Sequence, residues 1–561
     1  MVETSFEQLA RLGEALEQTN KRKEMGGLLA EFLRALSPQE IPPAVRLTIG
    51  QVFAEWDGRA LNLSWKTAMG IVDELVEATP EEREKASNQA VDGGEYVRLL
   101  LAQHRREPPQ PPPLTILDLF RTLEEIAETA GRGSRARKEA LLRGLLQRTS
   151  ALEAKYLAKI IYQEMRHGAS EGVMLQGIAR AAGVKSRLVR RANQLWGDVG
   201  EVALVALTEG EAGLKKASVR LFRPLKPMLA QTADDLAEAL ARYEGRVALE
   251  YKLDGARVQI HRQGDQVRIF SRNLADVTSS LPDVAAEVRA QMAVEEAIVE
   301  GEAVAVDAEG RPLPFQHLMR RFRRKHAIEE TIKEIPVQLY LFDALYVEGT
   351  SLVDAAYQKR WTALREAAGG LGLVRRLVPE TEGEAEAFAE AAHRGGHEGV
   401  MAKELKSAYK PGVRGKAWLK IKHVESLDLV IVAAEWGYGR RHGWLSNYHL
   451  AARDLASGRY RVVGKTFKGL TDVQFQEMTE RLLALEQSRQ GNAVVVQPRV
   501  VVEVLFNEIQ ESSQYRSGFA LRFARIARIR EDKSPAEADT LETVDRLYEA
   551  QFRYKGKLVG R

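Results

Sequence analysis

Apolar side chains recur at helical spacing through roughly the first 215 residues. Leu9, Leu12 and Leu16 share one face of an expected helix, and later stretches repeat this pattern. One break stands out at 106–115, where five prolines exclude a continuous helix. We therefore expect a helical region with a linker or an exposed loop at these prolines.

The pattern changes at about residue 218. Short runs rich in β-branched and aromatic residues alternate with helical patterns such as 354–367 and 382–394, which is typical of an α+β domain. Beyond residue 424 the runs continue with one helical insert at 472–488, which indicates a small β-barrel. The predicted fold class is a multidomain chain, with an all-helical domain at 1–217, an α+β domain at 218–423 and a β-barrel domain at 424–561.

Composition narrows the class of protein. The chain has 561 residues, 45% hydrophobic and 29% charged, which fits three or four folded domains and excludes disordered and collagen-like chains. It contains no cysteine, so disulfides, thiolate nucleophiles and cysteine-ligated metal sites are excluded. The net charge of +4 does not by itself indicate an acidic partner.

The sequence shows neither a signal-peptide pattern nor a membrane-spanning run, and this bears on the expected compartment. The first residues are acidic where a signal peptide begins with basic residues, and no run of about 18 apolar residues follows anywhere in the chain. We therefore expect a cytoplasmic protein without contact to a membrane.

The main chemical signal is the sequence EYKLDGAR at 250–257. Lys252 ends the run VALEYK, an Asp-Gly turn follows, and the chain continues as RVQIH, which is typical of a β-hairpin. The amine would then be held on a rigid element at the mouth of a loop. A single Lys-x-Asp-Gly match is weak evidence, and an ordinary surface lysine beside a turn would produce the same pattern.

Other charged motifs follow in a fixed order. Glu300 and Glu302 stand in the apolar run AIVEGEAVAV, where a buried carboxylate is costly unless it has a partner. The remaining motifs are SRN at 271–273, FD at 342–343, EGVMAK at 398–403, YKPGVRG at 409–415, WLKIK at 418–422, RFAR at 522–525 and DK at 532–533.

This order of motifs resembles the nucleotidyltransferase superfamily of ATP-dependent DNA ligases, RNA ligases and capping enzymes, and most closely the three-domain archaeal-type DNA ligases. The segments 120–142 and 153–172 resemble that family's helical DNA-binding domain, and 223–231 resembles the entry into its adenylation domain. The segment 528–540 resembles its C-terminal motif. The resemblance implies a helical DNA-binding domain, an adenylation (nucleotidyltransferase) domain and an OB-fold domain.

The resemblance implies three steps. Lys252 attacks the α-phosphate of ATP and releases pyrophosphate, AMP passes to the 5′-phosphate at a nick, and the 3′-hydroxyl then displaces AMP. A free lysine, with a pKa of about 10.4, is mostly protonated, so attack requires a lowered pKa. Arg257, Lys420 and Lys422 are the candidate neighbouring cations.

The resemblance also implies the roles of individual side chains. Lys252 carries AMP, Glu250 recognises adenine and Phe342 stacks on it. Four cations contact the nucleotide: Arg257, Arg272, Arg414 and Lys420. The expected cofactors are ATP and Mg²⁺, with Glu302 at the ribose and the metal, and Glu398 as a second metal ligand. Arg525 and Lys533 orient the leaving pyrophosphate; Ala524 departs from the proline that the family commonly has there.

The implied partner is nicked double-stranded DNA, bound by one monomer without base-specific readout. Basic clusters at 131–138 and 185–191, and the stretch 437–449 with its cations and aromatics, are suited to phosphates. A hinge is expected near 421–427. The stretch ILDLF at 116–120 faintly resembles a sliding-clamp peptide, but a helix face explains it better.

Other readings stay open at this stage. An RNA ligase or a capping-type nucleotidyltransferase is the alternative within the superfamily, and a non-catalytic DNA-binding scaffold is the alternative outside it. ATP is the default nucleotide, although ADP, GTP and NAD⁺ remain open. Replication is not separated from repair or recombination.

Overall fold

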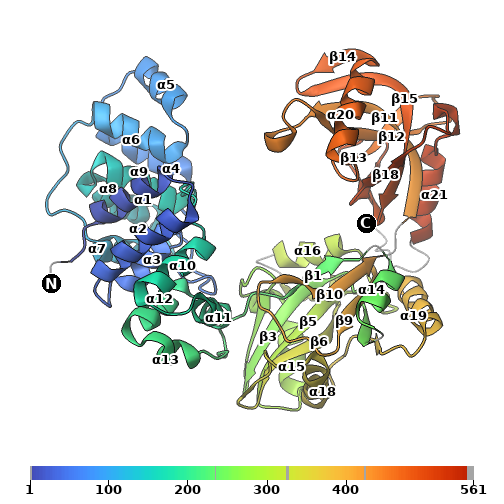
Figure 1. Ribbon diagram of the computed structural model, residues 1–561, viewed down its shortest axis with the longest axis horizontal. Coiled ribbons are helices and arrows are strands. Elements are labelled where there is room, and N and C mark those ends of the chain that lie inside the picture. The colour runs from blue at the N-terminus through green and yellow to red at the C-terminus, as the bar shows by residue number, and fades with distance from the viewer. Residues whose placement is uncertain (1–2, 234, 245, 324–327, 423–424, 552–561) are drawn as a thin grey trace.

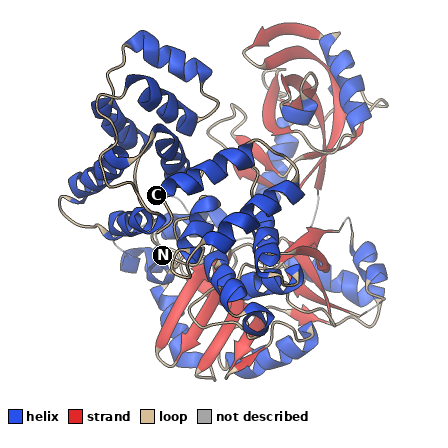
Figure 2. Cartoon of the chain, turned by 60° about the vertical axis from the view of Figure 1, so that its left-hand side comes forward, coloured by secondary structure: helices blue, strands red, loops and turns tan. Residues whose placement is uncertain are grey.

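The computed structural model describes residues 3–551 except 234, 245, 324–327 and 423–424. Three parts follow one another along the chain: a helical part, a mixed part and a strand-rich part (Figure 1). Figure 2 colours the elements by type: the helical part, as far as it is described, contains helices without a sheet, and the sheets lie in the other two parts, which also contain helices. None of the helices in the described residues is long and apolar enough to span a membrane.

The helical part is built from amphipathic helices around one core. Several begin at a Ser or Thr whose side chain caps the first turn while a Gln, Glu or Asp side chain three residues on bonds back to the cap. The helices are α1 (Phe6–Glu17), α2 (Arg22–Ala35), α3 (Ile41–Thr48), α4 (Trp65–Leu75), α5 (Pro80–Gln89), α6 (Gly93–His104), α7 (Ile116–Glu128), α8 (Ser134–Arg148), α9 (Ala151–Tyr162), α10 (Glu171–Ala182), α11 (Ser186–Trp196), α12 (Val199–Thr208) and α13 (Gly210–Lys215).

The proline-rich stretch links α6 and α7, and residues 106–113 are all exposed, as expected for a loop. The stretch that follows it does not suit a clamp peptide. Ile116 and Leu119 are fully buried in α7, and Leu117 is 8% exposed. A partner could reach these side chains only if α7 unfolded.

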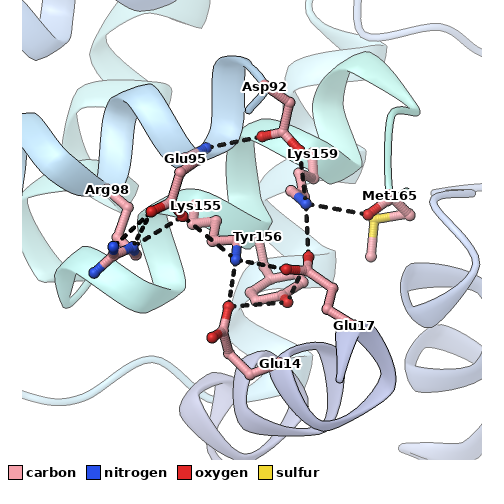
Figure 3. Close-up of polar contacts among 9 residues, drawn as sticks. All are labelled: Glu14, Glu17, Asp92, Glu95, Arg98, Lys155, Tyr156, Lys159 and Met165. Atoms are coloured by element: carbon pink, nitrogen blue, oxygen red, sulfur yellow. Dashed lines mark hydrogen bonds and ion pairs between the residues drawn. The ribbon is translucent and has the colours of Figure 1, made fainter. Parts of the chain in front are cut away.

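Buried charges join three helices of this part (Figure 3). Lys159 of α9 is 2% exposed, and its ammonium contacts Glu17 of α1 at 2.6 Å and the N-cap Asp92 of α6 at 3.0 Å. It also donates to the carbonyl of Met165 at 3.2 Å. Lys155, one turn earlier, contacts Glu17 at 2.8 Å. These ion pairs fix α1 and the start of α6 against α9.

The mixed part contains two five-stranded sheets. The first has the order β1 (Leu229–Thr232), β10 (Arg414–Lys422), β9 (Gly399–Glu404), β2 (Val247–Tyr251) and β8 (Arg376–Leu377). The second has the order β4 (Gln266–Ser271), β3 (Ala256–Gln263), β5 (Glu296–Ala305), β6 (Val337–Val347) and β7 (Thr350–Ser351). The helices of the mixed part are α14 (Leu236–Arg242), α15 (Pro282–Gln291), α16 (Phe315–Arg323), α17 (Ile328–Glu334), α18 (Tyr357–Ala368) and α19 (Glu382–Arg394).

The expected hairpin around Lys252 is wrong. β2 pairs with β8 and β9, whereas β3 pairs with β4 and β5, so the chain crosses from one sheet to the other between Lys252 and Gly255. A Cβ on Gly255 would lie 2.4 Å from the carbonyl oxygen of Ala303, so the crossing requires glycine. An Asp-Gly turn after a strand has the same local pattern whether the next strand joins the same sheet or another.

The strand-rich part forms a six-stranded sheet and a two-stranded sheet. Its elements are β11 (Glu425–Trp436), β12 (Leu445–Arg453), β13 (Tyr460–Thr466), α20 (Asp472–Leu483), β14 (Glu486–Gln490), β15 (Ala493–Phe506), β16 (Glu508–Glu511), β17 (Phe519–Arg522), β18 (Arg525–Ile529) and α21 (Leu541–Gln551). The helical insert is shorter than expected, because 486–490 pairs with β15. The predicted boundary at 423/424, within the expected hinge, lies outside the described residues.

The helical and mixed parts share one apolar core. The connecting segment at 222–228 contributes Leu225 and Met228 to it, and the mixed part contributes Tyr409 and Trp418 among others. Lys226 adds polar contacts, since its ammonium lies 2.9 Å from Glu55 and 3.0 Å from Glu171 of the helical part. The strand-rich part has a core of its own.

Replacing Lys159 by Met should destabilise the helical part. The change keeps the length of the side chain but leaves Glu17 and Asp92 without this partner. Removing one partner of a buried ion pair lowers the free energy of unfolding by about 3–5 kcal/mol. Hydrogen exchange of the α9 amides measures the free energy of opening. The control Lys21→Met removes an exposed ion pair with Glu24 and should leave exchange unchanged. Equal exchange in the two variants would contradict the prediction.

Candidate functional site

A cavity of about 430 Å³ lies where the two sheets of the mixed part meet. The side chains predicted as nucleophile, nucleotide contacts and metal ligands all line it: Glu250, Lys252, Arg257, Arg272, Glu302, Phe342, Glu398, Arg414 and Lys420. Further lining residues are Leu229, Ala230, Tyr251, Leu253, Asp254, Gly255, Phe315, Val374, Met401, Lys403, Trp418, Lys422 and Phe523. Residues more than 150 positions apart in the sequence thus converge on one polar hollow.

Lys252 sits where the chain leaves β2, and its ammonium forms an ion pair with Glu398. Lys422 contacts the same carboxylate at 2.9 Å. Burial acts to raise the pKa of Glu398, but the two ammonium groups outweigh it and lower this pKa to about 2. The backbone fixes the arrangement, because the Glu398 amide donates to the Lys252 carbonyl at 3.0 Å.

Cations crowd the same side of the cavity. Burial lowers the pKa of Lys420, and the positive charges of Lys422, Lys252 and Arg414 lower it further. Arg414 itself is exposed and donates to the Ala230 carbonyl at 2.9 Å. Such a group of cations is suited to an anion with several charges, such as a polyphosphate.

Two carboxylates face these cations. Burial raises the pKa of Glu302 to about 7, with Lys252 and Arg257 opposing the rise and Glu398 and Asp254 adding to it. Among the described residues, no group of three or more metal-ligating side chains is found. Mg²⁺ is often bound by one or two carboxylates together with substrate phosphates, and Glu302 with Glu398 fits that donor set.

The floor of the cavity contains a second ion pair, which sequence reasoning missed. Lys403 is 1% exposed, and its ammonium lies 2.6 Å from the carboxylate of Glu250, which also accepts from the Tyr357 hydroxyl. The same ammonium lies 4.6 Å from the ring centre of Phe342 and 4.3 Å from that of Trp418. The sequence did contain a signal for this pair. Lys403 stands in the apolar run GVMAK, and a charged residue in an apolar run indicates a buried charge that needs a partner, as noted for Glu300 and Glu302.

Two buried donors of the site have no partner. The Nε–H of Arg257 and the indole N–H of Trp418 make no hydrogen bond within the described residues. A buried donor without an acceptor is costly, and a bound ligand with acceptor atoms would remove that cost.

Arg272 is exposed at the end of β4 and also lines a neighbouring cavity of about 650 Å³. This second cavity lies between the helical part, at 51–63 and 160–163, and the mixed part, at 226–227 and 272–274. The candidate site therefore adjoins a groove between the two parts.

The strand-rich part contributes Phe523 to the cavity lining. This residue is 54% exposed, and its ring centre lies 4.7 Å from the Lys422 ammonium. Arg525 and Lys533, the residues expected at the pyrophosphate, do not line the cavity in this structure. Lys533 instead forms an ion pair with Asp428 of β11, and Arg530 contacts the same carboxylate at 2.9 Å.

The basic cluster at 131–138 differs in one residue from the expectation. Lys138 is 8% exposed, and its ammonium donates to the Leu61 carbonyl at 2.8 Å, so it does not face solvent. This residue lies on the inner face of α8, which the run of charges concealed. Arg132 and Arg135 are exposed at the start of the helix.

The site thus combines an amine, a set of cations and two carboxylates in one hollow, the requirements for transfer of a nucleotidyl group through a lysine. Comparisons with known proteins agree with this chemistry. The chain matches the family models "DNA ligase N terminus" at 5–179, "ATP dependent DNA ligase domain" at 227–422 and "ATP dependent DNA ligase C terminal region" at 441–533.

Curated relatives match over nearly the full length. The chain is 46% identical to DNA ligase 1 of Korarchaeum cryptofilum, over 98% of this chain and 99% of that protein. It is 43% identical to the DNA ligase of Thermococcus fumicolans, over 98% and 100%. A solved structure named Pmar-Lig_PreS3 shares the fold, with a TM-score of 0.51 and 18% identity over 93% of this chain and 99% of the other. The chain belongs to the ATP-dependent DNA ligases.

Proposed function

We propose that Lys252 is the residue that carries AMP when this ligase seals 5′-phosphate/3′-hydroxyl nicks in duplex DNA. The observation that supports it best is the placement of the Lys252 amine beside Lys420, Lys422 and Glu398 in one cavity. In the first step the amine forms a bond to the α-phosphorus of ATP, and the bond to the leaving pyrophosphate breaks. The amine gives up a proton to water in this step, because Glu398, with a pKa of about 2, is too weak a base to hold it.

The purine is proposed to bind at the floor of the cavity. Phe342 supplies a ring for stacking, and the Glu250–Lys403 pair presents an acceptor and a donor side by side. Arg257, Arg272, Arg414 and Lys420 then lie on the ribose and phosphate side of the nucleotide. The unpartnered donors on Arg257 and Trp418 support a ligand with acceptor atoms at this depth.

Glu302 and Glu398 are proposed to hold Mg²⁺. When bound, this ion would offset the charge of the phosphates and stabilise the pentavalent arrangement at phosphorus. For Glu398 to contact a metal, its ion pairs with Lys252 and Lys422 must loosen. That exchange of partners would release the Lys252 amine from the carboxylate.

Nicked double-stranded DNA is the proposed substrate, bound by a single chain. Exposed arginines at the start of α8 and on α11 would contact phosphates on either side of the nick. Lys533 does not line the cavity and pairs with Asp428 of its own part, so a movement of the whole strand-rich part is proposed to accompany the first step. The same chemistry serves DNA replication, repair and recombination.

The proposal is tested by labelling the protein with α-phosphate-labelled ATP, ADP, GTP and NAD⁺ in parallel. ATP should label the chain, mass spectrometry should place AMP on Lys252, and Lys252→Ala should abolish the label because no other amine occupies this position. Lys406→Ala, which removes an exposed lysine beyond β9, should label normally. The labelled protein is then offered nicked DNA, nicked RNA and diphosphate-ended RNA. Loss of the label to an RNA, or a label on another side chain, would overturn the proposal.

Glu398→Gln tests the metal proposal. Because the amide is a weaker ligand for Mg²⁺, the Mg²⁺ concentration for half-maximal self-adenylation should rise about tenfold or more. The control Glu390→Gln alters an exposed carboxylate of α19 and should leave this Mg²⁺ concentration unchanged. A normal Mg²⁺ dependence in Glu398→Gln would exclude this residue as a metal ligand.

Arg132→Gln tests the DNA-binding face. Affinity for a nicked duplex should fall equally for all sequences, and the slope of log affinity against log salt should decrease by about one unit for one lost phosphate contact. Self-adenylation should be normal. Arg11→Gln, which alters an exposed side chain of α1, serves as the matched control. An unchanged salt slope in Arg132→Gln would contradict the prediction.

A further inference from the structure

One face of β3 is polar although it is buried. Val258 and Ile260 point into the apolar core of the mixed part, as expected for alternating positions of a strand. The intervening residues are Arg257, Gln259 and His261, which are polar, and Gln259 and His261 are 4% and 0% exposed. Burying three polar side chains in a row is costly unless each of them has partners.

Hydrogen bonds run along this face from the connecting segment to the cavity. The Phe222 amide donates to Nδ1 of His261 at 2.9 Å, so the ring proton lies on Nε2 and is donated to Oε1 of Gln259 at 2.9 Å. The Leu225 amide also donates to this Oε1, at 2.8 Å. The amide nitrogen of Gln259 in turn donates to Glu300 at 3.4 Å.

The chain of hydrogen bonds ends on the guanidinium of Arg257. One amino group, Nη2, lies 2.8 Å from Glu300 and 3.3 Å from the Tyr409 hydroxyl, and the other, Nη1, donates to the Met228 carbonyl at 2.7 Å. Both terminal nitrogens are therefore held from the side away from the cavity. The Nε–H is left without a partner.

Glu300 is the carboxylate in this network of hydrogen bonds around Arg257. It is 1% exposed, and it does not line the cavity, whereas Glu302, two positions further along β5, does. Its two oxygens are divided between Gln259 and Arg257. The ring centres of Phe342 and Trp418 lie 5.4 Å and 5.6 Å from the guanidinium carbon, so Arg257 has little freedom to turn.

We propose that Glu300 is a positioning residue for the adenylation step, which acts by holding Arg257 in the orientation that receives the nucleotide. The inference rests on the proposed function, since it assumes that Arg257 contacts ATP. A guanidinium that is already held in place loses no conformational entropy when the nucleotide binds. Holding it therefore raises the affinity for the nucleotide. Glu300 itself touches neither ATP nor DNA.

The test is Glu300→Gln, which keeps the shape and a hydrogen-bond acceptor but removes the charge. The KM for ATP in self-adenylation should rise about tenfold, the size expected for a weakened charge-assisted hydrogen bond. The rate at saturating ATP should change by less than about threefold, as for a loss of binding alone. Glu296→Gln, on the same strand but away from Arg257, is the matched control and should behave as the wild type.

A double-mutant cycle separates positioning from a direct role. In the Arg257→Gln background, Glu300→Gln should have no further effect on the KM, because the residue through which it acts is gone. If the double variant raised the KM by the product of the two single effects, the proposal would be overturned. A normal KM in Glu300→Gln would overturn it as well. A fall in active protein without a change of KM would show a structural role only and would likewise overturn it.

Tyr409→Phe provides a second test, should Glu300→Gln fold poorly. It removes the hydroxyl that contacts Arg257 and that also accepts from the Met228 amide at 2.9 Å. The KM for ATP should rise about twofold to threefold, less than for Glu300, because the contact with Arg257 is longer and neutral. An unchanged KM would contradict the proposal. Failure of the proposed function looks different, since wild-type protein would then carry no AMP on Lys252, whatever the variants do.

Discussion

The ion pair between Lys252 and Glu398 organises the site. An amine can attack phosphorus only without its proton. Glu398 is shared with Lys422 at 2.9 Å, so one carboxylate holds the nucleophile and a neighbouring cation together. Both sheets are needed for this pair to lie beside Glu302, because β2 and β9 place Lys252 and Glu398 while β5 supplies Glu302.

Buried charges elsewhere around the cavity also form ion pairs. Glu250 is paired with Lys403 at the floor, and Glu300 is paired with Arg257 behind the wall. Asp343 and Arg360, both fully buried, form a further pair at 2.8 Å in the same region. Matched charges are costly to break, so they hold the functional side chains in place before any nucleotide arrives.

Much of the site could be predicted from the sequence because each motif is short and local. Lys252, Glu250 and seven further predicted side chains line one cavity, whereas Arg525 and Lys533 do not; the roles of all of them are predictions. Local patterns could not show that the chain crosses between sheets at Gly255, because pairing partners lie far away in the sequence. They also missed that Lys138 faces inward and that Lys403 and Glu300 complete the pairs, since burial depends on what packs against a residue.

The shared core of the helical and mixed parts has a consequence for how the molecule moves. Leu225, Met228, Tyr409 and Trp418 are buried in the same cluster as the helices, so these two parts cannot separate without exposing apolar surface to water. The strand-rich part buries its apolar side chains in a cluster of its own. The strand-rich part can therefore change its position without opening a core shared with the other two, which the movement proposed for the first step would require.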